Sequence, residues 1–314
     1  MTRKTNRATP GTREPKGGTR SHAIRHTISD KLTATDKPTA TAASALPPTA
    51  TLMISAVETG ESLSGIDVAL LPGRAAFLPA TQTLVCSDLH LGKAATFRRA
   101  GLPVPEGSAQ QDLSRLADLV TDHAAKQLVI VGDLFHARAG CTPRVLEEFL
   151  AFRETIRKEC QTKVVLVLGN HERSLGRRFS PADLGIDACL TELSQPPFRF
   201  IHEPDVHEPV LSLLPTRAPA TVPTAQQPST AAGLTIAGHL HPTISLKSPS
   251  GDRMTERCFV ATETCLILPA FGSFTGGHRL KPSPGMQIWL ARDDGVMALP
   301  KSPSVYQRRK TSNR

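Results

Sequence analysis

The 314-residue chain is long enough for one large domain or two small ones, and its apolar content of 39% allows a substantial core. The formal net charge of +9 lies at the two ends: residues 1–50 carry +6 and residues 301–314 carry +5, which leaves −2 for residues 51–300. The basic ends either add non-specific affinity for nucleic acid or serve solubility alone, and the part between them is close to neutral.

The sequence lacks the patterns of a membrane-spanning, secreted or disulfide-stabilised protein. The longest apolar runs, such as residues 164–168, are far too short to cross a bilayer, and the N-terminal segment has no apolar core of the kind that signal peptides carry. The six cysteines show no C-x-x-C spacing and no regular framework. We therefore expect reduced thiols and a cytoplasmic protein.

Composition divides the chain into a central domain and two tails. Residues 1–51 are rich in Thr, Ala, Pro and Arg and are predicted to be a disordered basic tail, because they cannot bury enough apolar surface. Residues 52–300 are predicted to form the folded domain, and residues 301–314 a second basic tail. Within the domain, residues 215–233 form a predicted low-complexity insertion rich in Ala, Pro and Thr.

The first half of the domain alternates strands and helices in its apolar pattern. The predicted elements are strands at 74–78 and 83–87, a helix at 93–100, a helix from Ser108, a strand at 127–131, a helix from Thr142 and a strand at 163–168. Ser108 followed by Gln111 is the pattern of a capping box, and Thr142 before Pro143 is the pattern of an N-cap before a first-turn proline. This alternation predicts an α/β sheet layer.

Two apolar helix faces and a second group of strands complete the prediction. The helix faces carry Leu113, Leu116, Leu119 and Val120, and then Val145, Phe149, Phe152 and Ile156. After about residue 196 the helical period fades, and strands are predicted at 198–202, 234–237, 243–246, 258–261, 265–268 and 286–291.

The strand predicted at 83–87 leads into the sequence Asp88-Leu89-His90. Residues i and i+2 of a strand point to the same face, so the two polar side chains are predicted to project together from the strand's carboxyl end. Open α/β sheets place their ligand sites there. A capping Asp beside a buried His would leave the same short pattern, so the interpretation depends on the residues at the ends of the later strands.

Further polar residues with metal-binding side chains stand at the ends of later predicted strands. With the first pair, the candidates are Asp88, His90, Asp133, Asn170, His202, His239 and His241. Two acids, one amide and four imidazoles without a thiolate suit Mn²⁺, Fe or Zn²⁺ in a five- or six-coordinate site rather than a structural zinc site. Seven side chains exceed the needs of one ion, so a bridging carboxylate would divide them between two.

These residues stand in five ordered motifs that resemble those of the calcineurin-like metallophosphoesterases. The motifs are Ser87-Asp88-Leu89-His90, Gly132-Asp133-Leu134-Phe135-His136, Gly169-Asn170-His171-Glu172, Ile201-His202-Glu203-Pro204 and Gly238-His239-Leu240-His241-Pro242. Between Arg74 and Trp289 the chain is most similar to the bacterial ligase-associated DNA damage response endonucleases, above all over residues 92–105, 238–242 and 268–277.

The resemblance implies a four-layer α/β/β/α sandwich and phosphoester hydrolysis by a metal-activated hydroxide. Two divalent cations, Mn²⁺ in the first place and Fe or Zn²⁺ as alternatives, are its implied cofactors. Carried over by motif, one ion takes Asp88, His90 and His241, the other takes Asn170, His202 and His239, and Asp133 bridges them. His207 is an alternative to His202 as a ligand of the second ion, and we favour His202.

The same motifs imply roles for residues beside the ligands. His171 would donate a proton to the leaving oxygen, and Glu172, where the related endonucleases more usually have Asp, would orient it. His136 would lie beside the ligands or face the substrate. Apart from the motifs, the cationic side chains of Arg98 and Arg99, with Lys93, could contact phosphate; a solvated helix face is the alternative.

The resemblance further implies a DNA endonuclease or phosphodiesterase that acts in DNA damage repair. DNA is then the substrate, and a DNA ligase, helicase or exonuclease is a protein partner implied by the family alone. The alternative enzyme is a nucleotide phosphodiesterase or phosphoprotein phosphatase. A non-catalytic scaffold with this fold is a third hypothesis, which the complete set of motif residues disfavours.

Overall fold

A computed structural model of the chain describes residues 49–54, 57–58, 61–62, 66–175, 180–204, 233–248 and 250–300. The predictions for residues 1–48, 215–232 and 301–314 lie outside the described residues, whereas residues 50 and 51 of the predicted N-terminal tail belong to the first strand, Ala50–Ile54. None of the helices in the described part of the chain has the length and apolar character that a transmembrane span requires. All six cysteines are free thiols.

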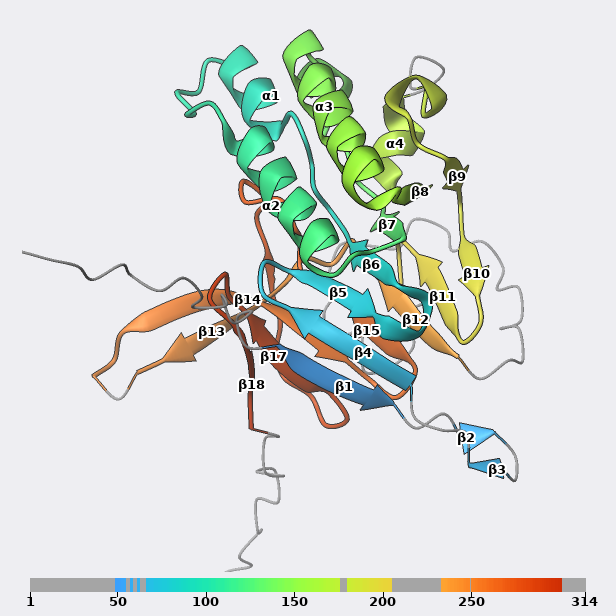
Figure 1. Ribbon diagram of the computed structural model, residues 1–314. Coiled ribbons are helices and arrows are strands. Elements are labelled where there is room, and N and C mark those ends of the chain that lie inside the picture. Colours follow the sequence, from blue (N-terminus) through green and yellow to red (C-terminus); the bar gives the residue numbers. More distant parts are fainter. Residues whose placement is uncertain are drawn as a thin grey trace, which may run out of the picture. The chain divides into compact units, whose positions relative to one another are not determined.

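The first sheet has seven strands in the order β1-β4-β5-β6-β7-β8-β9 (Figure 1). Their bounds are β1 Ala50–Ile54, β4 Ile66–Leu71, β5 Ala75–Leu78, β6 Thr83–Cys86, β7 Gln127–Val131, β8 Lys163–Val167 and β9 Ala188–Leu190. Strands β6 to β9 are parallel, whereas β1, β4, β5 and β6 pair antiparallel. The parallel part brings the carboxyl ends of β6, β7 and β8 to one edge, as the sequence predicts.

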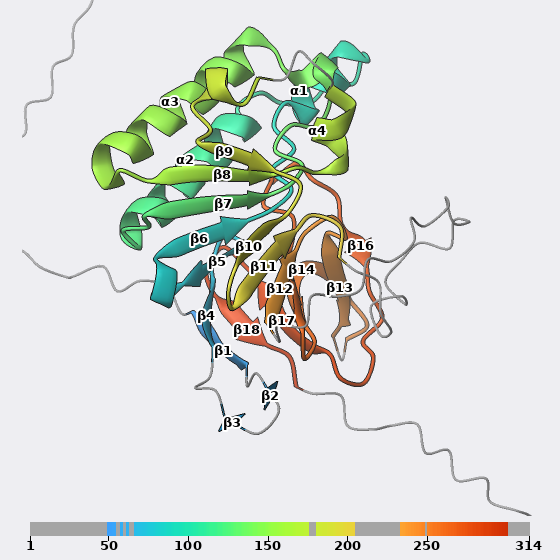
Figure 2. The same cartoon turned by 90° about the vertical axis from the view of Figure 1, so that its right-hand side faces the viewer.

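The helices of the described residues cover one face of this sheet (Figure 2). They are α1 Lys93–Arg99, α2 Ser108–Asp122, α3 Pro143–Cys160 and α4 Asn170–Leu175, with short 3-10 turns at Pro79–Thr81, Arg138–Gly140 and Ala182–Leu184. The Thr142 hydroxyl caps α3 by accepting from the Val145 N–H, as predicted. The capping box at Ser108 is wrong: Gly107, with φ of 94°, is the N-cap, and Ser108 is already helical.

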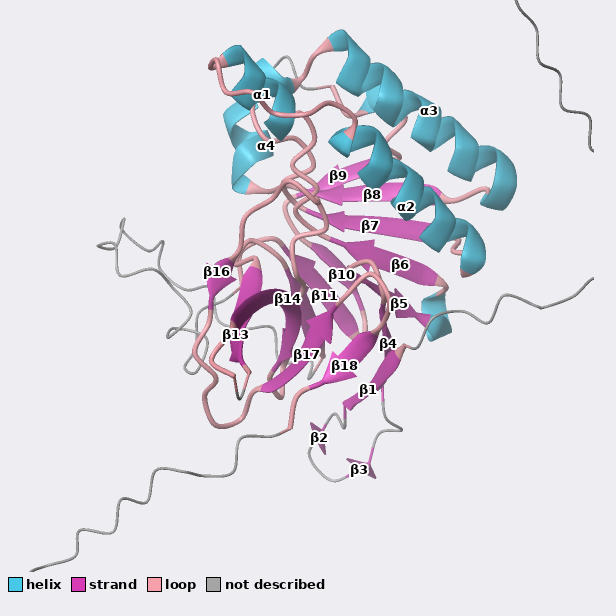
Figure 3. Cartoon of the chain, turned by 90° about the vertical axis from the view of Figure 1, so that its left-hand side faces the viewer, coloured by secondary structure: helices cyan, strands magenta, loops and turns pink. Residues whose placement is uncertain are grey.

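The second sheet has nine strands and packs against the first (Figure 3). Its path is β10-β11-β12-β15-β14-β13-β16, and β17 joins it through β14 and carries β18. The bounds are β10 Leu193–Gln195, β11 Phe198–Ile201, β12 Leu234–Ala237, β13 Pro242–Lys247, β14 Arg253–Ala261, β15 Cys265–Ile267, β16 His278–Arg279, β17 Gln287–Ala291 and β18 Val296–Ala298. A separate two-stranded ribbon joins β2 Val57–Glu58 to β3 Glu61–Ser62.

Strand alternation divides the core into layers. Along β7, Leu128 and Ile130 pack under the helices, while Val129 and Val131 face the second sheet. The α/β sandwich with two sheets is therefore confirmed. The described residues provide no helix for the fourth layer: the outer face of the second sheet packs instead against Leu280 and Met286 from the connection between β16 and β17.

Candidate metal centre

Five strand ends deliver the predicted ligands to one place. Strands β6, β7 and β8 of the first sheet lead to Asp88, Asp133 and Asn170, while β11 and β12 of the second sheet lead to His202 and His239. Within each sheet these neighbouring strands pair in parallel, so their carboxyl ends share one edge (Figure 2). The side chains converge where the two sheets meet.

The first group, called here the first trio, consists of Asp88, His90 and His241, whose ligand atoms all lie within 4.8 Å of one another. Asp88 Oδ1 is 2.9 Å from His241 Nε2, and His241 Nε2 is 3.3 Å from His90 Nε2. Asp88 Oδ1 is buried, yet its surroundings give it no hydrogen bond of acceptable geometry. One carboxylate oxygen and two imidazole nitrogens thus point at a common centre.

The second trio consists of Asp133, His202 and His239, again with ligand atoms within 4.8 Å. His202 Nε2 lies 3.4 Å from Asp133 Oδ2 and 3.3 Å from His239 Nδ1. The Asn170 amide adds a fourth group, because its Oδ1 is 3.1 Å from His202 Nε2. A Cβ on Gly132 would collide with the His202 ring, so glycine is required at that position for the imidazole to enter the centre.

Asp133 connects the two trios. Its Oδ2 lies 3.7 Å from His90 Nε2 on one side and 3.4 Å from His202 Nε2 on the other. Burial raises the pKa of this carboxyl, but the His202 and His171 groups outweigh that effect and hold it well below its usual range. An ionised, buried carboxylate therefore stands between the two groups of imidazoles.

The backbone that carries these residues is held in an uncommon conformation. Asp88, His90, Asp133, His239 and His241 all have φ between 44° and 67°, the left-handed region that residues with a Cβ seldom adopt. Such strain persists only where surrounding contacts enforce it, and it concentrates at functional sites. Here the N–H groups of Asp88 and His90 donate to the carbonyl groups of Gly132 and Asp133, at 3.1 and 2.8 Å.

The convergence of Asp88 and His90 was predicted for a reason that proves wrong. Strand β6 ends at Cys86, so Asp88 and His90 do not lie on a strand. They converge because both residues take left-handed dihedral angles in the loop after the strand, rather than through strand alternation.

A family model for calcineurin-like phosphoesterases matches residues 81–243, which include both trios, Asn170 and His171. The chain belongs to the calcineurin-like phosphoesterase family. It is a metal-dependent phosphoesterase, with the two trios as its candidate dimetal site.

Solved structures give further likenesses. The nuclease MPE of Pseudomonas putida is 30% identical with a TM-score of 0.58, and the match covers 80% of this chain and 100% of that chain. A protein of unknown function from Aquifex aeolicus is 16% identical (TM-score 0.29; 51% and 78% covered), and the phosphoesterase Yfce of E. coli is 15% identical (TM-score 0.30; 66% and 86% covered). No curated protein matches the chain.

The donor set of this metallophosphoesterase fits divalent cations. The buried Asp88 Oδ1 lacks a hydrogen bond, and burial lowers the pKa of His90 to about 3, so its imidazole is neutral and available as a ligand. Burial also opposes a charge on His202, but Asp133 and Asp88 raise the pKa of that imidazole to about 9. A cation at the second trio must therefore displace a proton from His202.

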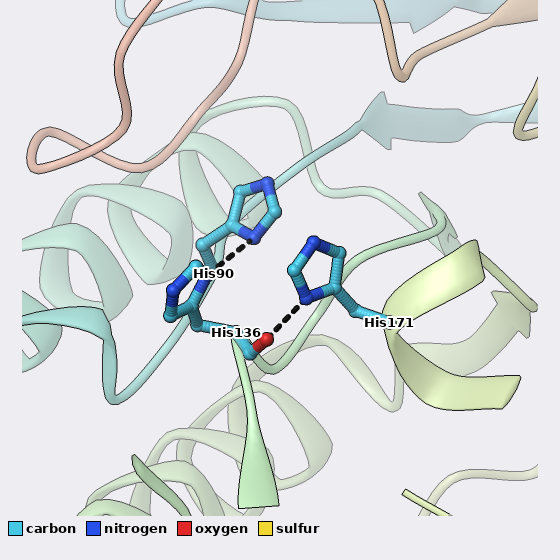
Figure 4. Close-up of side chains that lie close together, drawn as sticks. All are labelled: His90, His136 and His171. Carbon is cyan, nitrogen blue, oxygen red and sulfur yellow. Dashed lines mark hydrogen bonds between the residues drawn. The ribbon is translucent and has the colours of Figure 1, made fainter. Parts of the chain in front are cut away.

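His171 lies beside the trios and is the more accessible group. Its side chain is 28% exposed, and its Nε2 is 3.7 Å from Asp133 Oδ2. Its Nδ1 bonds to the His136 carbonyl oxygen, and the His136 ring lies with its Nδ1 3.5 Å from His90 Nδ1 (Figure 4). His136 thus contacts both a candidate ligand and the candidate proton donor. Burial, followed by the charge of Lys93, lowers the pKa of His136 to about 4.

Glu172 has a different role from the one expected. Its carboxylate accepts three backbone N–H groups, from Asp133 at 2.8 Å, Gly169 at 3.0 Å and Phe135 at 3.1 Å, whereas His171 is oriented by the His136 carbonyl. Glu172 therefore ties the loop after β7 to the loop after β8. Burial raises its pKa, but three N–H donors compensate its charge in the folded protein.

The structure does not bring Arg98 and Arg99 into the centre. The Arg98 guanidinium donates to the carbonyl oxygens of Val104 and Pro105, and that of Arg99 donates to the carbonyl oxygen of Ala139. Both side chains hold neighbouring loops. His207, the alternative to His202, lies outside the described residues.

A supporting loop at 270–275 had no role in the sequence interpretation. The N–H groups of Phe271 and Gly272 donate to the carbonyl oxygens of Ser87 and Asp88, and the loop's own carbonyl groups accept from three arginines. These are Arg74 and Arg115 on Phe271, and Arg257 on Ala270, Ser273 and Thr275. The only signal in the sequence was the loop's likeness to the endonuclease family, because the three arginines come from distant elements.

Proposed function

We propose that this metallophosphoesterase is a dinuclear-metal-dependent DNA endonuclease that acts in DNA repair. The observation that carries the two-metal part is the meeting of two ligand trios at one carboxylate oxygen, Asp133 Oδ2. The DNA part is supported by the likeness to a nuclease whose whole chain is covered at 30% identity.

In this proposal the first ion takes Asp88, His90 and His241, and the second takes Asn170, His202 and His239. Asp133 bridges the two. The absence of thiolates among these donors favours Mn²⁺, with Fe and Zn²⁺ as alternatives. Two divalent cations held by these residues would supply Lewis-acid chemistry, lowering the pKa of a water molecule and neutralising charge on the phosphoryl oxygens.

His171 is the proposed proton donor to the leaving oxygen. The bond from its Nδ1 to the His136 carbonyl oxygen directs that nitrogen to the backbone, so Nε2 is the nitrogen that faces the centre, 3.7 Å from Asp133 Oδ2. Its 28% exposure allows contact with a substrate, in contrast to the buried ligands Asp88 and His202. The geometry needed for general acid catalysis is therefore available at this atom.

Two other functions make different predictions. A nucleotide phosphodiesterase or phosphoprotein phosphatase would use the same centre on a smaller or different ester. A non-catalytic scaffold would not need His171 beside two complete trios, and this arrangement disfavours it. The same proposal includes a cytoplasmic location and a DNA ligase, helicase or exonuclease as a protein partner. It also includes a catalytic domain at residues 52–300 between two basic tails.

The direct test is to incubate the full-length protein, supplied with Mn²⁺, with supercoiled plasmid, a duplex with a 5′ overhang and a panel of nucleotides and phosphopeptides. We expect internal cleavage of DNA that a chelator abolishes. Hydrolysis of nucleotides or phosphopeptides without any DNA cleavage would contradict the endonuclease assignment and favour the alternative enzyme.

A further inference from the structure

Helix α1 begins at the rim of the metal centre. The Lys93 N–H donates to the His90 carbonyl at 3.1 Å, and the His136 N–H donates to the Leu91 carbonyl at 3.0 Å. The first turn of the helix is therefore tied to the loops that carry a candidate ligand and its neighbour. Side chains that this turn presents toward His136 have a fixed position relative to the centre.

Lys93 is a half-buried cation whose ammonium has no anionic or carbonyl partner among the described residues. The other two cations of α1, Arg98 and Arg99, are both engaged by backbone carbonyl groups. Burial, followed by the nearby charge of Arg257, lowers the pKa of Lys93. Lysine is rarely buried without a partner, and a like charge nearby makes its position less favourable still. An anion from outside the chain would reverse that cost.

The exposed aromatic ring of Phe274 lies on the same side of the centre, in contact with the ring of Phe97. Phe97 follows Lys93 by one helical turn and therefore shares its face. The Phe97 ring meets His136 edge-on at 6.3 Å between centroids and meets Phe274 at 5.6 Å. Phe274 is 36% exposed and is the one aromatic residue among the exposed large apolar side chains of the described residues.

The loop that presents Phe274 is itself fixed to the metal centre. The Gly272 N–H donates to the Asp88 carbonyl at 3.2 Å, and the Ser273 N–H donates to the buried Asp112 carboxylate at 2.8 Å. An exposed ring on a well-anchored loop is a suitable surface for a flat, apolar ligand group, because little freedom is lost when it is covered.

From these positions we infer that Lys93 and Phe274 bind the nucleotide next to the scissile phosphodiester, Lys93 through its phosphate and Phe274 by stacking on its base. This inference rests on the proposed action on DNA. These two contacts would let the centre distinguish a polynucleotide from a small phosphodiester. The small ester would bind at the metal centre without reaching either side chain. Ammonium–phosphate pairing and base stacking are both tolerant of sequence.

The test compares the duplex with a 5′ overhang against bis(4-nitrophenyl) phosphate, both with Mn²⁺-loaded enzyme. In Lys93→Gln, the fold-increase in the KM for DNA should be about five times the fold-increase in the KM for the small ester, or more. The slope of log KM against log salt for DNA should become shallower by roughly 0.7–0.9, the value for one lost phosphate contact. Lys93→Arg should restore most of both effects, because it keeps the charge.

Phe274→Ala should raise the KM for DNA by roughly ten-fold, within the range for loss of one stacked base, and leave the salt slope as in the wild type. Phe274→Trp should restore binding. Lys163→Gln is the matched control: it removes the same charge from an exposed position at the start of β8, the end of the strand opposite to Asn170. It should change neither quantity.

The outcomes separate this inference from the proposed function. If the wild-type protein hydrolyses the small ester but does not cut DNA, both fail. If it cuts DNA and Lys93→Gln and Phe274→Ala behave like Lys163→Gln, the inference alone is wrong. If either variant impairs both substrates equally or loses metal, that residue acts through the metal centre, and the inference is overturned for it.

Discussion

The two trios of the metal centre are held in different ways. In the second trio, His202 is 2% exposed and its Nδ1 donates to the Val131 carbonyl at 3.0 Å, so the protein orients the ring. In the first trio, the His241 side chain is 21% exposed, and the polar contacts shown for its ring are with Asp88 and His90 of the same trio. The fold therefore orients His202 of the second trio, whereas His241 of the first trio is oriented by the other two members of its trio.

This difference suggests that the two ions are not equivalent. A site whose ligands are already fixed loses less freedom on binding a cation than one whose ligands must be ordered. At a pH at which His202 has lost its proton, we expect the ion at the second trio to bind more tightly and the ion at the first trio to exchange more readily. Asp133, which reaches both, couples the two.

The largest effect is expected at that coupling. Asp133→Asn should lose at least one metal ion and nearly all hydrolysis, because the bridging negative charge balances two cations. The measurements are metal content by elemental analysis and turnover on an aryl phosphodiester. Two full equivalents of metal with normal turnover would refute the bridging role.

The next effect separates chemistry from metal binding. His171→Ala should keep both metal ions and DNA affinity while turnover on DNA falls roughly 10²–10⁴-fold, the range for a lost general acid. The loss should be smaller for a nitrophenyl ester, whose leaving group needs little protonation. A loss of metal would instead identify His171 as a ligand; normal DNA cleavage with both ions present would point to His136 as the proton donor.

A pair of variants tests the inequality of the trios directly. His241→Ala and His202→Ala should each retain about one equivalent of metal, and the ion that remains in His241→Ala should resist a chelator longer than the one that remains in His202→Ala. The measurement is the rate of metal release to a coloured chelator. Equal rates would show that orientation by the Val131 carbonyl does not strengthen the second trio.

A smaller effect is expected at Glu172. In Glu172→Gln one acceptor oxygen becomes an NH₂ group, so at least one of the three backbone N–H groups loses its partner. Metal affinity should fall by roughly 10–100-fold, the range for residues that support ligands. Isothermal titration with Mn²⁺ measures it, and an unchanged affinity would show that the two loops hold their positions without this carboxylate.

The smallest effect concerns the basic tails. Removing residues 1–48 and 301–314 deletes charges of +6 and +5 and leaves β1 intact. If the tails touch DNA, the salt slope of binding should flatten by roughly 0.9 for each lost phosphate contact. An unaltered slope would limit the tails to a role in solubility, and loss of turnover on the aryl ester would show that they belong to the fold.

The parts of the fold that follow from local patterns were predictable. Strands β7 and β8 are short, continuous apolar runs, as expected of strands buried on both faces, and Thr142 before Pro143 marks the start of α3. Strand β4 was missed. Its apolar run at residues 66–71 lies before the region in which strands and helices were predicted to alternate, and no predicted helix lies next to it in the sequence. In the structure it pairs antiparallel with β1 and β5.

The candidate site was predictable as a set of residues but not as a geometry. Ordered motifs placed Asp88, Asp133 and His239 at strand ends, yet nothing local indicates that all three adopt positive φ. Glu172 was expected to orient its neighbour, whereas its partners include N–H groups 37 and 39 residues away. Contacts of this kind depend on which loops the sheets bring together, and a pattern of neighbouring residues does not contain that information.

The central claim is that two cations share Asp133, and titration of the metal-free protein with Mn²⁺ under electron paramagnetic resonance tests it most directly. The account predicts saturation at two equivalents, a signal of a single uncoupled ion up to the first equivalent, and a magnetically coupled pair as the second ion binds. DNA cleavage should appear with that second ion. Saturation at one equivalent with full cleavage, or two ions that never couple, would contradict it.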